Sequence, residues 1–302
     1  MMSPTDADFV IRSYRYLRLA LVITTLTLGI SLVIEIVGAG CYQGSISAFY
    51  YTPVHSVFIG VLFVIGVSLV ALLGRDPVED LFFDLAGFLA PVVALVPTER
   101  PGDLCGPADR LLTVPNTLLV KNNTVALFLG FAIAFLAAAR LAGQLGNMSR
   151  ANRIGLGLSA AVLAIGVGWY LAWNDVFLRR AHGTAAVAMF VAIWAAVMVN
   201  ADFPGVIRRL LSAVYRWLAV QEPTHDDDSV HATRYRPWYR ATAVVMALAG
   251  IVLGIAVRAG VSHAVFWLEV AEIVPFAGFW LLQTIEGWDS GSTAPATVTV
   301  AA

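Results

Sequence analysis

The chain has 302 residues, of which 59% are hydrophobic and 13% charged, and its formal net charge is −1. Soluble domains carry about 25% charged residues, so lipid rather than water must surround most of this chain. The near-neutral charge, with no basic cluster among aromatic residues, gives no case for a nucleic-acid partner.

Eight apolar segments follow a short polar start at residues 1–18, and the first lacks a small-residue cleavage site, which favours an anchor over a signal peptide. Each is about long enough to cross a bilayer core of about 30 Å at a helical rise of about 1.5 Å per residue. None shows the period of two residues that a membrane barrel requires. The segments are Leu19–Gly38, Ser56–Gly74, Leu81–Pro97, Thr124–Gly143, Ile154–Ala172, Gly183–Ala201, Ala241–Gly260 and Ala264–Ile285.

This pattern predicts an all-α polytopic integral membrane protein, a bundle of about eight transmembrane helices in one domain over residues 1–288. Residues 289–302 are small and polar and predict a disordered C-terminal tail. With the N-terminus inside, 13 of the 19 Lys and Arg residues fall on the cytoplasmic side, where basic residues concentrate. We therefore expect both termini in the cytoplasm and, from the Ala- and Arg-rich composition, the inner membrane of a bacterium.

The turn Arg75–Asp80 on the cytoplasmic side is rich in charge but resembles the start of a helix more than a binding site. Asp76 is a favourable N-cap, and Pro77 suits the first helical position. Glu79 and Asp80 suit the positive end of the helix dipole. We therefore predict that these residues cap the third helix.

The segment between the sixth and seventh apolar runs is the one sizeable cytoplasmic piece. Residues 205–220 place Val206, Leu210, Val214 and Leu218 on one helical face, which predicts an interfacial amphipathic helix on the anionic inner leaflet. Residues 221–240 are predicted to be a cytoplasmic loop. The run His225–Asp228 within this loop resembles a metal-binding tract but is more typical of a solvated charge run.

The two cysteines, Cys41 and Cys105, cannot form a CxxC motif, and the predicted topology places both in outer loops. An oxidising compartment would allow a Cys41–Cys105 disulfide, and two unpaired thiols are the alternative.

Ionisable residues inside a membrane are costly, so each one indicates a functional site. Here they gather near the outer ends of the predicted helices, beneath the polar segment Ser45–Tyr51. Glu269 and Glu272 are three residues apart and share roughly one helical face. The predicted outward-facing pocket contains Glu35, Ser47, Tyr50, Tyr51, His55, His182, Glu269 and Glu272.

Three interpretations of these groups remain open. In the first, His55, His182 and His263 bind zinc, and a metal-bound water attacks a lipid-like substrate, although no HxxxH or HExxH spacing is present. In the second, Glu269 and Glu272 form, with Glu35, an ion- or proton-coupled transport site, near the interruption of the eighth segment at Pro275. In the third, the groups bind one another, lipid headgroups or water.

We favour a non-enzymatic or transport- and lipid-related protein without a cofactor, with membrane lipids and a small-molecule, ion or lipid ligand as partners. A metal-dependent intramembrane hydrolase is the alternative. An enzyme or a transporter requires the outer groups to converge on one pocket, whereas a non-enzymatic membrane factor lets them scatter around the rim.

Several sequence blocks resemble a group of uncharacterised bacterial multi-pass membrane proteins. The resemblance covers about half of the chain and is most specific in its first block. The resemblance implies that Tyr50, Tyr51, His182 and Glu269 belong to one recurring outer site. The blocks are SISAFYYTP at 45–53, FIGVLF at 58–63, DLAG at 84–87, VALVPT at 93–98, the residues from His182 to Phe190, and FWLE at 266–269.

Two departures from this group stand out: its members resemble six-span proteins, so the fourth and fifth segments read as an inserted pair, and His55 sits where an Arg is more usual. The chain also resembles, more distantly, the ceramidase-like membrane hydrolases, which use intramembrane His, Ser and Asp. That likeness rests on residue types rather than on a matched motif, and it supports the metal interpretation.

Overall fold

The computed structural model describes residues 4–72, 74, 76–113, 117–144, 150–204, 206–218 and 230–289, and every regular element in these ranges is a helix. Two short 3-10 helices, η1 (Ser47–Tyr51) and η2 (Ala108–Arg110), lie in the loops. The α-helices are α1 (Pro4–Ala39), α2 (His55–Ala71), α3 (Pro77–Leu95), α4 (Thr117–Gln144), α5 (Arg150–Ala172), α6 (Asn174–Ala201), α7 (Val206–Leu218), α8 (Val230–Arg258) and α9 (Ala264–Asp289).

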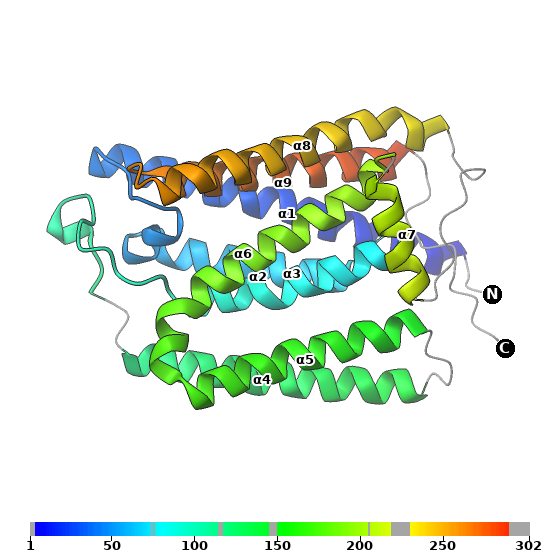
Figure 1. The fold of residues 1–302 in the computed structure, drawn as a ribbon, viewed down its shortest axis with the longest axis horizontal. Coiled ribbons are helices and arrows are strands. Elements are labelled where there is room, and N and C mark those ends of the chain that lie inside the picture. The colour runs from blue at the N-terminus through cyan, green and yellow to red at the C-terminus, as the bar shows by residue number, and fades with distance from the viewer. Residues whose placement is uncertain are drawn as a thin grey trace.

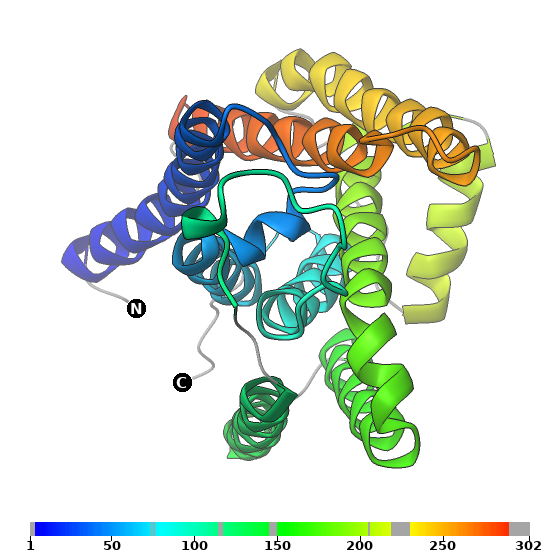
Figure 2. The same cartoon turned by 90° about the vertical axis from the view of Figure 1, so that its left-hand side faces the viewer.

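Among the described residues, six helices are long and apolar enough to cross a membrane, namely α1, α4, α5, α6, α8 and α9. The helix α2 has only 17 residues, and α3 carries Glu79, Asp80 and Asp84. Both lie in the middle of the bundle, with α1, α6 and α9 around them (Figure 2). The prediction of an all-α multi-pass membrane protein is supported, and six of its eight predicted spans meet the length and composition of a spanning helix.

Several helices begin earlier than the hydropathy pattern predicted, and α1 and α6 show two different reasons. α1 takes in most of the polar start, because Arg18 is buried and its guanidinium donates to the Gln283 carbonyl at 2.7 Å. α6 begins at Asn174 and places Asp175 in its first turn, where an acidic residue suits the helix dipole. The short outer loop expected before His182 is therefore helical, and His182 lies two turns inside α6.

The predicted loop over residues 221–240 is wrong from residue 230 onward, because α8 begins there. Tyr235 and Tyr239 lie four residues apart and are both buried, so this basic stretch has a core-facing side. Arg240 donates to the Ala201 and Asp202 carbonyls at 2.9 and 2.7 Å and so binds the C-terminal end of α6. Residues 219–229, including the run His225–Asp228, and residues 290–302 of the predicted tail lie outside the described residues.

At the end where α1 begins and α9 ends, the structure contains the predicted helix cap, and it contains a helix within the segment predicted to be interfacial (Figure 1). Asp76 caps α3 by accepting from the Val78 amide at 2.7 Å, and Pro77 is the first helical residue. The predicted interfacial segment forms the amphipathic helix α7 across this end, and the Tyr215 hydroxyl donates to Asp76 at 2.6 Å. Burial raises the pKa of the Asp76 carboxyl, while these hydrogen bonds act in the opposite direction.

The centre of the bundle depends on a close crossing of α2 and α3 at Gly66 and Gly87. A Cβ atom on Gly66 would lie 2.8 Å from the Gly87 carbonyl oxygen, and one on Gly87 would lie 2.6 Å from a Val70 methyl. Small residues allow helix backbones to approach where no hydrophobic force drives association in lipid.

Candidate functional site at the disulfide end

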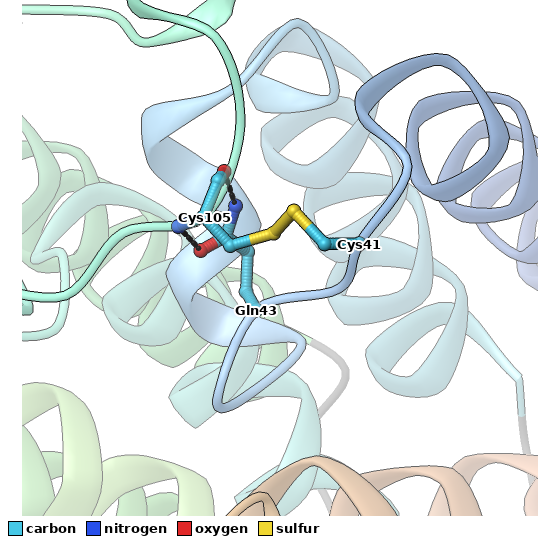
Figure 3. The surroundings of a disulfide bond; sticks show 3 residues. All are labelled: Cys41, Gln43 and Cys105. Atoms are coloured by element: carbon cyan, nitrogen blue, oxygen red, sulfur yellow. Dashed lines mark hydrogen bonds between the residues drawn. A yellow bond between two sulfur atoms is a disulfide. The ribbon is translucent and has the colours of Figure 1, made fainter.

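Two loops, residues 40–54 and 96–113, cover one end of the bundle, and we call them the cap (Figure 1). Cys41 and Cys105 form the predicted disulfide between these loops, with their Cα atoms 6.2 Å apart (Figure 3). Beside it, the Gln43 side chain donates to the Cys105 carbonyl at 2.7 Å and accepts from the Cys105 amide at 3.0 Å. The cap is therefore tied by one covalent bond and one reciprocal amide pair.

An ion pair joins the cap to α1. The Arg110 guanidinium lies 3.0 Å from the Glu35 carboxylate, which is almost fully buried. Gly38 makes this approach possible, because a Cβ atom there would lie 2.6 Å from an Arg110 nitrogen. Glu35 was predicted to line the pocket. In the structure, its ion pair with Arg110 binds the second loop of the cap to α1.

Glu269, near the start of α9, joins the cap to the centre of the bundle. Its carboxylate accepts a hydrogen bond from the Ser47 hydroxyl at 2.6 Å and another from the Ile46 amide. One turn earlier, the Phe266 amide donates to the Gly44 carbonyl at 3.0 Å. The Glu269 carboxylate thus has a hydrogen-bond donor for each of its two oxygen atoms, both from the start of η1. These bonds fix the position of the cap relative to α9.

Below Glu269 lies a central cavity of about 50 Å³, lined by α1, α2, α3, α6, α9 and the start of η1. Its wall is apolar except for Thr25, Ser47 and Glu269, and Thr25 already donates to the Leu21 carbonyl. The remaining wall includes Leu28, Phe58, Ile65, Val93, Met189 and Phe276. The cavity thus has an apolar body and one polar end, which is closed by the cap.

Tyr50, Tyr51 and His55 form a group beside this cavity rather than in its wall. The rings of Tyr50 and His55 are 4.3 Å apart, and the His55 Nδ1 atom lies 2.7 Å from the Tyr50 carbonyl oxygen. The Tyr51 hydroxyl donates to the Thr98 carbonyl at 2.6 Å. Burial raises the pKa of Tyr50 to about 12, as expected of a phenol without solvent around it.

The three histidines of the metal interpretation lie apart. The Nδ1 atom of His182 lies 2.7 Å from the Val96 carbonyl oxygen, so this nitrogen carries the proton. The buried Nε2 atom of His182 has no hydrogen-bond partner among the described residues. His263 stacks on Tyr42 with ring centroids 4.6 Å apart. Within the described ranges, no three His, Cys, Asp or Glu side chains lie close enough together to hold a metal ion. The residues present therefore do not fit a zinc site there.

Glu272 does not converge on Glu269, although the two are three residues apart. It is buried on the side of α9 that packs against α8, where its Oε1 atom would lie 3.6 Å from a Cβ atom on Gly250. Of the eight residues predicted to form the pocket, the structure brings only Ser47 and Glu269 to the central cavity. The others support the cap or lie at helix contacts.

Sequence reasoning missed a buried polar cluster at the opposite end of the bundle. Glu79, assigned to capping, is 1% exposed and accepts from the side-chain amides of Asn200 and Gln283 at 2.7 and 2.8 Å. Arg18 donates to the Gln283 carbonyl in the same region. Polar residues inside the otherwise apolar runs of α6 and α9 were the available signal, because a buried amide requires a partner.

Fold and site together define an all-α membrane protein with a capped internal cavity that ends at one carboxylate. Comparisons of the chain with protein-family models, curated proteins and solved structures found no match. The resemblances noted for the sequence blocks therefore remain predictions.

Proposed function

We propose that this integral membrane protein binds a small amphiphile in its central cavity, as a binding or transport protein rather than as an enzyme. The observation that carries the proposal is the position of Glu269. Its carboxylate lines an otherwise apolar cavity and also holds the cap that closes it. A ligand with an apolar body and a hydroxyl or amine head would match both parts of this wall.

The Glu269 contacts suggest how binding and opening are coupled. Ser47 and Ile46 donate to the same carboxylate that a ligand head would use. A ligand donor would therefore replace Ser47 and loosen the contact between η1 and α9. The disulfide and the Glu35–Arg110 ion pair would keep the cap attached while this contact opens.

The orientation expected for such a protein places the cap outside the cytoplasm. A disulfide in the cap supports this orientation, because disulfides persist in oxidising compartments. The excess of basic residues predicted for the other side supports it independently. The ligand would then be taken from the outer side or from the outer leaflet.

The proposal is tested by the molecules that remain bound when the full chain is purified in detergent. We would extract the protein and compare small molecules by mass spectrometry for the wild type, Met189→Trp and Val187→Trp. Met189 lines the cavity, whereas Val187 is 66% exposed, so the two substitutions place the same side chain inside and outside the cavity. Glu269→Gln tests the polar end.

We expect one compound that is retained by the wild type and Val187→Trp, lost from Met189→Trp and reduced in Glu269→Gln. Identical extracts from all four proteins, each of which elutes as a single folded species, would refute a ligand in the cavity. If Met189→Trp lost the compound but Glu269→Gln retained as much of it as the wild type, Glu269 would not be part of the binding site.

A further inference from the structure

A second and larger cavity lies away from the cap, between the α4–α5 pair and the rest of the bundle. It measures about 190 Å³ and is formed by α3, α4, α5 and α6. Figure 1 shows α4 and α5 side by side along one edge of the molecule. Ile165 lines this groove and is also 68% exposed, so the groove opens to the surroundings of the bundle.

The walls of the groove are apolar except for the hydroxyl side chains of Ser159 and Thr184. Phe88 and Val92 on α3 face Leu163 and Gly166 on α5, and small residues of α6, including Ala188, form the third side. Because Gly166 has no side chain, the groove stays open at this point. A Cβ atom on Gly166 would already contact the Phe128 ring at 3.4 Å. A largely apolar groove that opens to the surroundings of the bundle matches a hydrocarbon chain.

An aromatic cluster marks the end of the groove nearest the cap. The rings of Phe128, Trp169, Tyr170 and Phe177 lie 5.3 to 5.9 Å apart in the measured pairs. Trp and Tyr are typical of the level of lipid headgroups. The groove therefore runs from that level toward the middle of the membrane.

Basic residues from two helices lie at this same end. Lys121 is seven residues before Phe128 and so shares its face of α4, about two turns nearer the cap. Arg180 lies three residues after Phe177 and four before Thr184, both of which line the groove. Arg179 lies about 100° around the helix from Arg180, on the face of α6 where Asp175 lies four residues before it.

We propose that the groove holds one acyl chain of an anionic phospholipid, whose phosphate binds Lys121 and Arg180. Lipid tails are as apolar as the groove wall, so the tail alone gives little preference between groove and bulk membrane. The charge of the headgroup must therefore supply the selectivity. This site is independent of the central cavity and of any ligand there.

The experiment is native mass spectrometry of the full chain in detergent, with phosphatidylglycerol or phosphatidylcholine of identical acyl chains added. We expect the wild type to retain one phosphatidylglycerol molecule more strongly than phosphatidylcholine. Arg180→Gln and Lys121→Gln should each weaken phosphatidylglycerol retention about fivefold, the effect of one basic residue near an anionic headgroup. Arg179→Gln is the matched control and should behave as the wild type.

A second pair of variants tests the tail. Gly166→Leu fills the groove and should weaken both lipids, whereas Gly168→Leu places the same side chain where nothing lies within 4 Å. Ala188→Leu replaces Gly166→Leu if the latter fails to elute as a single species. Equal retention of the two lipids by the wild type would overturn the proposal. So would equal losses in Arg179→Gln and Arg180→Gln, or groove-filling variants that bind lipid normally.

Discussion

The α2–α3 pair and the α4–α5 pair are both formed by consecutive helices, but they differ in how their glycines are used. In α2–α3, Gly66 and Gly87 bring two backbones into contact under the cap. In α4–α5, Gly166 leaves an open slot, and a Cβ atom on Gly157 or Gly168 would meet no described atom of another element within 4 Å. The comparison shows that glycine in a membrane helix can serve either close packing or open space, and that only the neighbouring side chains distinguish the two.

The largest expected effect comes from removing the disulfide above α2–α3. Cys41→Ser should lower the free energy of unfolding by about 4 kcal/mol, because the bond closes a loop of 64 residues. Thermal unfolding in detergent, followed by circular dichroism, measures the change. Reductant should destabilise the wild type and leave Cys41→Ser unaffected. If neither the Cys41→Ser substitution nor reductant lowered the melting temperature of the protein, the disulfide would not stabilise the fold.

The glycines themselves give the next effect. Gly87→Val should lower the free energy of unfolding by about 2 kcal/mol, since the new side chain overlaps Val70 and the Gly66 carbonyl. Gly157→Val in α5 is the matched control and should stay within about 0.5 kcal/mol, as expected at an open surface position. Similar losses for the two variants would show that the pairs do not differ in packing.

The smallest expected effect is the difference between two carboxyl groups of α9, Glu269 at the cap and Glu272 beside α8. Glu269→Ala leaves the Ser47 hydroxyl and the Ile46 amide without their acceptor, which should cost about 1–3 kcal/mol. Glu272→Ala should cost less, because Glu272 makes no hydrogen bond among the described residues. Unfolding of both variants in the same detergent decides this, and a larger loss for Glu272→Ala would reverse the ranking.

Sequence patterns predicted the class of protein, the Cys41–Cys105 pair, the Asp76 cap and the amphipathic helix α7. They failed where tertiary contacts decide the outcome. Hydropathy placed the start of α1 too late because Arg18 looks exposed in a sequence, whereas the fold buries it against Gln283. Likewise, an acidic residue after Asp76 suggests only a helix start, and nothing local indicates that Glu79 meets Asn200, 121 positions away.

The candidate site shows the same limit. Periodicity placed Glu269 and Glu272 on roughly one face, but the angle of about 60° that separates residues three apart on a helix is enough to send one toward the cap and the other toward α8. The histidines were assigned to one pocket from their place near helix ends. Each is instead fixed by a separate carbonyl or ring, which no spacing rule in the chain reveals.

The Cys41–Cys105 bond also has a mechanical consequence. Because it joins positions 64 residues apart, α2 and α3 lie inside a covalent ring. A force applied to the two ends of the chain would pass through the bond and bypass both helices. The fully stretched oxidised chain should therefore be shorter than the reduced chain by about 220 Å, because each residue within the ring would otherwise add about 3.5 Å.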